Sequence, residues 1–254
     1  MTRRRALTGL AVLALCGAAA LALGLSRNMT LPSPPVAEGR RAELGLFTSL
    51  PILWSEAPDM AAMLDSGDRP HWARVALERR FRLLPLDTLD LPSSPGSARL
   101  ILMAQPRALL PQENVALDRW VRGGGRVLLF ADPMLTLDSA YPIGDRRRPQ
   151  DIALLSPILA RWGLVLRFDE GQPAGWRESA GRSLPVNLSG TLAIGPGGHD
   201  ASCAIEDDAL IANCRIGAGR AVIVADAALL EPRDDSDGRK ARCLDELLDE
   251  ARGG

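Results

Sequence analysis

Residues 99–133, RLILMAQPRALLPQENVALDRWVRGGGRVLLFADP, contain the pattern that decides the fold. Residues 99–104 are predicted to form a strand, and their apolar side chains are typical of a central parallel strand that is covered on both faces. A helix is predicted to begin at Pro111, because proline suits the first helical turn and an apolar stripe of helical period follows it. Three glycines, 123–125, end this helix, and a second buried strand follows at 126–131. Strand, helix and strand in this order form a βαβ unit, which predicts a parallel sheet.

The segments on either side repeat this alternation of strands and helices. Further strands are predicted at 44–47, 81–86, 164–168 and 221–226, and further helices at 152–162 and 241–251. A hairpin is predicted around the turn Glu206-Asp207-Asp208. We therefore expect an α/β domain at residues 43–252, with a mostly parallel, flavodoxin-like or amidotransferase-like sheet that has helices on both faces. The hairpin is expected to be a C-terminal appendage of this domain.

The N-terminal part of the chain differs sharply from this domain. Residues 6–25, ALTGLAVLALCGAAALALGL, form an uncharged apolar run directly behind three arginines at 3–5. A helix of about 20 residues spans the roughly 30 Å hydrocarbon core of a bilayer, and a cluster of arginines stays on the cytoplasmic side. We therefore expect a transmembrane anchor at residues 1–27 and a linker at 28–42. This places the protein in a bacterial inner membrane as a single-pass protein with a cytoplasmic N-terminus and a periplasmic main domain.

Three other interpretations of the N-terminal run remain open. Ala20-Leu21-Ala22 fits the cleavage site of a signal peptide, although the apolar run is longer than in most signal peptides. Cys16 could be the acylated cysteine of a lipoprotein, but Leu15 occupies the position where a small residue is expected. The arginine cluster also resembles a twin-arginine export signal, and such clusters are common before apolar segments.

Composition excludes several classes of function. The chain carries 30 Lys and Arg against 31 Asp and Glu, mixed along its length, so the basic footprint of a nucleic-acid-binding protein is missing. Its 4 cysteines and 2 histidines show no metal-site spacing, and the sequence predicts neither a metal nor a cofactor. Cys203 and Cys214 are equidistant from the hairpin turn, and they are therefore a candidate disulfide pair in an oxidising compartment. The alternative is two small buried residues.

Residues 111–133 also carry a family resemblance. With the apolar strand that ends at Pro106, and with Gly217-Ala218-Gly219-Arg220 before a strand that ends in Asp226, they resemble the GldG-like auxiliary components of ABC transporters. The resemblance covers roughly residues 44–230. It implies an extracytoplasmic domain with the fold of class I glutamine amidotransferases, working beside the permease and ATPase subunits of a transporter. Many relatives end in another membrane helix, for which this sequence has no candidate.

Glutamine amidotransferase chemistry is not expected. It requires a cysteine at a sharp strand-to-helix turn and a histidine that activates it, and no cysteine after the apolar run stands in that setting. The glycines at 123–125 follow a helix and precede a strand, which is the reverse of a phosphate-binding loop.

The candidate binding site lies where the predicted strands end, because ligands of open α/β sheets bind beyond the carboxyl ends of the strands. Six side chains directly follow predicted strands and form the candidate ligand-binding or partner-binding site: Thr48, Ser49, Gln105, Arg107, Asp132 and Asp226. Each also has a structural interpretation, since Thr48, Ser49 and Asp226 can cap helices and Asp132 can form a turn.

These observations predict a non-catalytic, membrane-anchored accessory domain of an ABC-type transport system. One alternative is an exported hydrolase that uses carboxylates such as Asp132 and Asp226, which requires at least one of them to have a raised pKa in a closed cleft. The other is a soluble periplasmic ligand-binding protein released by cleavage of the N-terminal run. The motif of three arginines at 146–148 is predicted to be a solvated loop.

Overall fold

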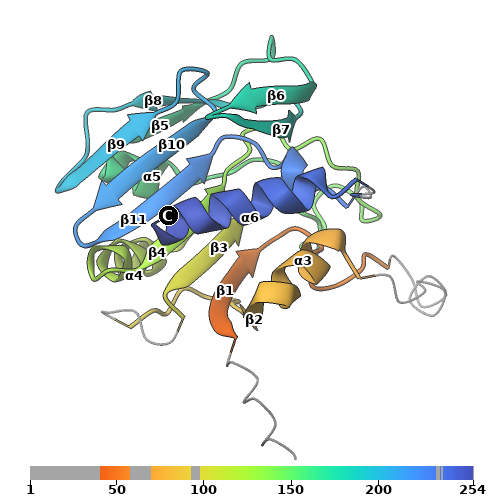
Figure 1. Cartoon of the computed structure of the whole chain (residues 1–254), viewed down its shortest axis with the longest axis horizontal. Coiled ribbons are helices and arrows are strands. Elements are labelled where there is room, and N and C mark those ends of the chain that lie inside the picture. The colour runs from red at the N-terminus through yellow and green to blue at the C-terminus, as the bar shows by residue number, and fades with distance from the viewer. Residues whose placement is uncertain (1–40, 58–69, 93–97, 233–234, 236, 254) are drawn as a thin grey trace, which may run out of the picture. The chain divides into compact units, whose positions relative to one another are not determined.

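A seven-stranded mixed sheet organises the chain in the computed structural model, which describes residues 41–57, 70–92, 98–232, 235 and 237–253 (Figure 1). The strand order is β2-β1-β3-β4-β11-β10-β9. The strands of this sheet are β1 (Ala42–Thr48), β2 (Phe81–Pro85), β3 (Leu100–Ala104), β4 (Arg126–Phe130), β9 (Ala201–Ile205), β10 (Ile211–Ile216) and β11 (Gly219–Val224). All five residues of β3 are buried, which explains its uninterrupted apolar sequence.

The hairpin β9–β10 corrects the predicted fold class. From β2 to β11 every neighbouring pair is parallel, but β10 pairs with β11 and β9 in antiparallel register. The sheet is therefore mixed, and the hairpin continues it instead of forming an appendage. The physical reason is burial, because Ile211, Ala212, Cys214 and Ile216 are all inaccessible and β10 needs a neighbour on each side.

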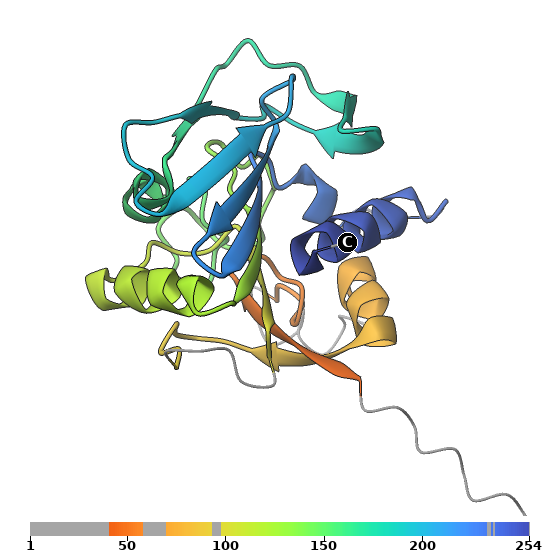
Figure 2. The same ribbon diagram turned by 60° about the vertical axis from the view of Figure 1, so that its left-hand side comes forward.

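Helices cover both faces of the sheet, as Figure 2 shows. Helices α3 (Trp72–Arg80) and α6 (Arg239–Arg252) contact each other on one face. Helices α4 (Pro111–Arg122) and α5 (Ser156–Trp162) contact each other on the opposite face. A short 3-10 helix, η1 (Ala228–Leu230), follows β11 and contacts α6.

Two small antiparallel sheets complete the described part of the chain. Strand β5 (Leu164–Arg167) pairs with β8 (Thr191–Ile194), and β6 (Gly175–Ser179) pairs with β7 (Arg182–Val186). Strand β6 was not predicted, because it is largely exposed and has no apolar alternation. Both small sheets lie beyond the seven-stranded sheet at the end where β9 and β10 lie (Figure 1).

The glycines after α4 act by close packing as well as by stopping the helix. Gly124 has a φ of +101°, and this left-handed residue turns the chain out of the helix. A Cβ on Gly125 would lie 2.2 Å from the ring of Trp120, and a Cβ on Gly219 would lie 1.9 Å from the carbonyl oxygen of Val121. The C-terminal end of α4 therefore packs directly on the start of β11, with no room for side chains.

The structure does not support the predicted membrane anchor. No helix among the described residues is long and apolar enough to cross a bilayer. Residues 6–25, on which the prediction rested, and the linker at 28–40 lie outside the described residues. The transmembrane helix and the inner-membrane location derived from it are therefore withdrawn.

Candidate functional site

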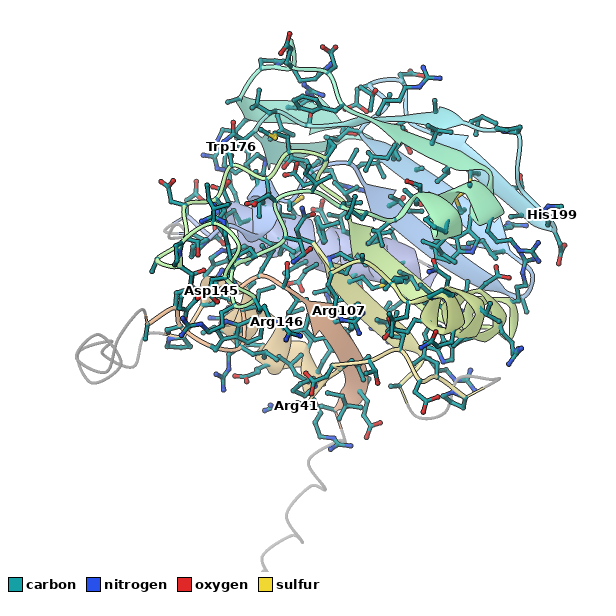
Figure 3. All side chains as sticks on the ribbon, turned by 180° about the vertical axis from the view of Figure 1, so that it is seen from behind. Arg41, Arg107, Asp145, Arg146, Trp176 and His199 are labelled. Carbon is teal, nitrogen blue, oxygen red and sulfur yellow. A yellow bond between two sulfur atoms is a disulfide. The ribbon has the colours of Figure 1, made fainter. Side chains whose placement is uncertain are left out.

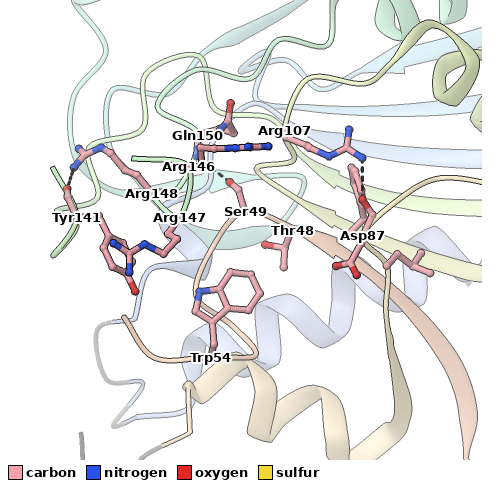
Figure 4. A pocket seen from close by; sticks show the side chains of 12 residues that line it. Thr48, Ser49, Trp54, Asp87, Arg107, Tyr141, Arg146, Arg147, Arg148 and Gln150 are labelled. Carbon is pink, nitrogen blue, oxygen red and sulfur yellow. Dashed lines mark hydrogen bonds between the residues drawn. The ribbon is translucent and has the colours of Figure 1, made fainter. Parts of the chain in front are cut away.

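A cleft of about 530 Å³ opens at the edge of the sheet where β1, β2 and β3 end (Figure 4). The residues that line it come from the ends of these strands and from the loop after β4. They are Phe47, Thr48, Ser49, Trp54, Leu86, Asp87, Arg107, Tyr141, Arg146, Arg147, Arg148 and Gln150. Three of the six predicted site residues, Thr48, Ser49 and Arg107, are among them.

Thr48 and Ser49 connect the strand ends and cap no helix. The Thr48 hydroxyl donates to the Ala104 carbonyl at 2.8 Å, and the Ser49 hydroxyl donates to the Gln105 carbonyl at 2.5 Å. The backbone N–H of Gln150 donates to Ser49 Oγ at 2.9 Å. These bonds fasten the loop after β4 to the ends of β1 and β3, so both hydroxyls help to shape the floor of the cleft.

Arg107 is held by a carboxylate of α4. Its two terminal nitrogens donate to the two oxygens of Glu113, at 2.7 and 2.8 Å. Glu113 also accepts hydrogen bonds from the backbone N–H groups of Leu110 and Leu89. The hydrogen bonds from Arg107 are the largest cause that lowers the pKa of Glu113 to about 2. Arg107 is therefore fixed and largely neutralised before any ligand arrives.

Three consecutive arginines form the opposite wall of the cleft. Arg147 pairs with Asp145 at 2.7 Å and Arg148 pairs with Asp151 at 3.2 Å. Arg146 forms no ion pair and no hydrogen bond among the described residues. Figure 4 shows its side chain extended across the cleft toward Arg107, and Figure 3 shows the two on the same side of the molecule. Arg146 is therefore the one cleft arginine available to an incoming anion.

Aromatic side chains supply the apolar part of the cleft. The side chain of Trp54 is 44% exposed, which is unusual for a tryptophan in a folded domain. Tyr141 is buried, its hydroxyl bonds to the backbone of Ala57, and Arg147 stacks on its ring at 4.1 Å. Exposed tryptophan beside arginine is a combination that is enriched at the centres of protein interfaces.

Gln105 is buried and has a structural role. Its side-chain amide donates to the carbonyls of Asp132 and Gln150, and its side-chain oxygen accepts from the backbone of Asp132. Its φ of +44° is left-handed, which is rare for a residue other than glycine. These bonds hold the chain turn after β3, so Gln105 supports the cleft from below and does not line it.

Asp132 and Asp226, the predicted acid pair, lie close together but are buried beyond the reach of a ligand. The two residues are 1% and 2% exposed. Asp132 accepts from the backbone N–H groups of Met134 and Ala227, and Asp226 accepts from those of Asn187 and Ala228. Both therefore perform the turn-forming and capping roles that were the structural interpretations of these positions.

Burial also changes the acidity of the pair. It raises the pKa of Asp132 to about 6, and burial together with the charge of Asp132 raises the pKa of Asp226 to about 8. A raised pKa is what the hydrolase alternative requires. However, a substrate cannot reach either carboxyl group, and all four oxygens already accept backbone hydrogen bonds, so the arrangement is not that of a reactive acid pair.

No accessible free thiol occurs in the described part of the chain. Cys203 and Cys214 face each other across β9 and β10 with Cα atoms 4.0 Å apart, and they form a disulfide. Cys243 is buried on α6, and burial raises the pKa of its thiol to about 12. His71 caps the start of α3. No group of three metal-binding side chains occurs among the described residues.

Sequence reasoning missed the loop that carries Tyr141 and Arg146. Arginine is so frequent in this sequence that three consecutive arginines gave no signal above the background. The loop reaches the cleft through the bond between Gln150 and Ser49, a contact over 101 residues of chain. No local sequence pattern predicts a contact between residues so far apart in the chain.

Comparisons with known proteins describe the fold and leave the family open. No family model matches the sequence, and no curated protein matches it at a significant level. The solved structure titled "mmIFT52 N-terminal domain" has a TM-score of 0.51 and 11% sequence identity, and the match covers 83% of this chain and 97% of that one. At this identity the similarity concerns the fold alone.

Two glycosidases also contain a similar region. The exo-β-1,4-mannosidase Op5Man5 from Opitutaceae bacterium strain TAV5 has a TM-score of 0.46 and 14% identity, with coverage of 85% of this chain and 35% of that one. The polyextremophilic β-galactosidase from the haloarchaeon Halorubrum lacusprofundi has a TM-score of 0.44 and 13% identity, with coverage of 84% and 30%. This chain spans about a third of the length of these enzymes, and their activity does not transfer to it.

Proposed function

We propose that this protein is a non-catalytic binding domain whose cleft receives an acidic segment of a partner protein. The observation that carries the proposal is that one cleft holds Trp54, which is 44% exposed, and Arg146, which has no ion-pair partner among the described residues. An exposed aromatic ring offers a large apolar contact, and a guanidinium offers a fork of donors to a carboxylate. Together they favour a peptide segment that carries an apolar side chain next to Asp or Glu.

The partner that we propose is a permease or ATPase subunit of an ABC-type transporter. Support comes from the resemblance of residues 111–133 to GldG-like auxiliary components of such transporters. The role is that of an accessory subunit that docks on the transporter through its cleft and does no chemistry itself. The buried positions of Asp132 and Asp226 make the hydrolase alternative the weaker of the two.

Affinity purification of the full chain from its native cells tests both parts of the proposal. Wild-type protein is expected to enrich transporter subunits. Trp54→Ala and Arg146→Gln are each expected to reduce that enrichment severalfold, since truncation of an interface tryptophan or arginine commonly costs about 2 kcal/mol or more. Mass spectrometry of the eluate gives both the identity and the amount of the partner.

Trp176→Ala is the matched control for the tryptophan variant. Trp176 is 45% exposed, as Trp54 is, but it lies on β6, well apart from Arg146 in Figure 3. Arg119→Gln serves the same purpose for Arg146, because Arg119 is exposed on α4 and outside the cleft. Enrichment without any transporter subunit would refute the transporter role. A partner that survives both cleft variants would refute the cleft as its docking site.

A further inference from the structure

Three arginines stand side by side at the opposite edge of the sheet, where the parallel strands begin. Arg126 of β4 is in register with Arg220 of β11, and Arg220 is in register with Arg215 of β10. Residues in register on neighbouring strands project from the same face of a sheet. With strands about 4.8 Å apart, three guanidinium groups therefore start from positions that span about 10 Å.

The row lies on the face that α6 covers, beside the end of that helix. Arg220 donates to the Glu250 carbonyl at 3.3 Å, and the guanidinium of Arg126 lies against Gly253. The Glu250 carboxylate is engaged elsewhere, because it pairs with Arg182 at 2.6 Å. Among the described residues no carboxylate forms an ion pair with any arginine of the row.

Like charges placed directly opposite on neighbouring strands destabilise a sheet. The C-terminal end of a helix offers a partial charge of about −0.5, whereas the row carries three full positive charges. The helix end therefore compensates only a small part of the repulsion. Such a row is favourable when a multiply charged anion lies between the guanidinium groups.

The row also faces open space of suitable size. Arg126, Arg215 and Arg220 line a cavity of about 310 Å³ at the turn Gly217–Gly219. Arg215 and Arg220 also line a neighbouring cavity of about 470 Å³ that continues along β9 and β10. A ligand could therefore place its anionic end among the three arginines and the remainder of its structure along the hairpin.

We propose that this row binds a diphosphate group. Two linked phosphates carry about three negative charges within the span of the row, and the planar guanidinium fork matches phosphate oxygens. A single carboxylate would leave most of the positive charge uncompensated. The site is distinct from the cleft of the proposed function, because the two lie at opposite ends of the parallel strands.

Titration calorimetry of the full chain with inorganic pyrophosphate tests the proposal. One equivalent is expected to bind, and binding is expected to weaken with added salt. Arg215→Gln and Arg220→Gln are each expected to weaken binding roughly tenfold or more, since each removes charge-assisted hydrogen bonds. Arg119→Gln, which removes one charge on α4 outside both sites, is expected to leave binding unchanged.

Two further ligands define the class that the row recognises. Tighter binding of ADP than of pyrophosphate would identify a nucleotide as the source of the diphosphate, and the reverse order would identify free pyrophosphate. Tighter binding of citrate than of either would overturn the assignment of a diphosphate.

Two results with pyrophosphate itself would overturn the row as the site. One is the absence of any binding to wild-type protein. The other is loss of binding in Arg146→Gln but not in Arg215→Gln, which would place the anion in the cleft instead. Circular dichroism of each variant checks that it is folded. Arg215 is exposed and forms no hydrogen bond or ion pair through its side chain among the described residues, so its variant is expected to fold.

Discussion

The two ends of the parallel strands both carry arginines, but they differ in how many of these arginines are paired with carboxylates. At the carboxyl ends, Arg107 is held by a buried glutamate and Arg147 by a neighbouring aspartate. Arg146 is the exception among the paired arginines there. At the amino ends, three arginines lie side by side, and none of them forms an ion pair with a carboxylate of the described residues, because the nearby Glu250 pairs with Arg182. The number of charged residues at an edge of the sheet therefore does not predict whether that edge attracts an anion. The pairing of each charge decides whether an edge is neutral or able to attract an anion.

The two ends of the parallel strands also differ in their buried acidic residues. Asp132 and Asp226 lie buried beneath the carboxyl ends, where chain turns present backbone N–H groups that need acceptors. The amino ends are closed differently, because Gly125 and Gly219 let the backbone of α4 and β11 meet without side chains. One end of the sheet is therefore held by polar bonds to acids and the other by close backbone packing.

The largest effect is expected from the buried acid pair. Its folded pKa values, about 6 for Asp132 and about 8 for Asp226, both lie above the ordinary value of 3.8. A raised pKa means that the folded state favours the protonated acid. The stabilisation is therefore complete below about pH 4 and is lost as the pH rises through 6 and 8. The free energy of unfolding is expected to fall by several kcal/mol over this range, measured by urea unfolding at a series of pH values.

Asp226→Asn sharpens this test, because asparagine keeps an acceptor for the backbone but carries no charge. The variant keeps only one of the two oxygens that accept backbone N–H groups, so it is expected to be less stable than wild type at low pH and to have a flatter pH profile. Asp138→Asn is the control, since Asp138 is exposed on the loop that follows β4 and begins near Asp132. An identical pH profile for Asp226→Asn and wild type would contradict the burial of a charge at this position.

A smaller loss of stability is expected when the ion pair between Arg107 and Glu113 is removed. Glu113→Ala removes the acceptor of Arg107 and of two backbone N–H groups. Because Arg107 is 37% exposed, solvent compensates part of its loss, and we expect the free energy of unfolding to fall by about 2 kcal/mol. Thermal unfolding at neutral pH measures the change. Arg107→Gln, which leaves the backbone bonds of Glu113 intact, is expected to cost less, and an equal cost would show that the ion pair alone carries the effect.

The smallest effect distinguishes the unpaired arginine row from Arg147, which is paired in the wall of the cleft. Arg215→Gln removes one charge from a row of like charges, so in the absence of ligand we expect it to stabilise the protein by a few tenths of a kcal/mol. The gain is expected at low ionic strength and to disappear in 1 M salt, where the Debye length is about 3 Å. Arg147→Gln, which breaks an ion pair of the cleft, is expected to give no such gain in thermal unfolding. A stability loss in Arg215→Gln at low salt would mean that the row is not repulsive.

Local sequence pattern correctly predicted structure where a residue acts on its neighbours in the chain. Pro111 begins α4 as expected, and the glycines at 123–125 end it. The expectation that Thr48 and Arg107 lie at one edge also held, because both follow strands that run in the same direction. The GldG-like resemblance, the transporter partner and the absence of catalysis remain predictions.

Pattern failed where a residue's role depends on distant segments. The hairpin at 201–216 was expected to stand apart, but its strand β10 pairs with β11 in the large sheet, and most apolar residues of β10 are buried. Gln105 was expected in a binding site and is instead buried by contacts with Asp132 and Gln150. The arginines at 146–148 lie on a loop, and Arg146 and Arg147 are exposed as expected, but their position in the wall of the cleft was not predicted. In each case the deciding partner lies tens of residues away in the sequence.

The βαβ unit at residues 99–133 and the polar residues that follow its strands could be predicted from local pattern, because hydrophobic period, proline and glycine act over a few residues. Local pattern could not predict which of those polar residues meet solvent or which arginines pair with a carboxylate, because both depend on tertiary contacts. Strand order and register set these outcomes, and both result from burial of the whole apolar core. The arginine row shows most clearly what local pattern cannot predict. Its members, Arg126, Arg215 and Arg220, lie between positions 126 and 220 and become neighbours only because β4, β11 and β10 pair with one another.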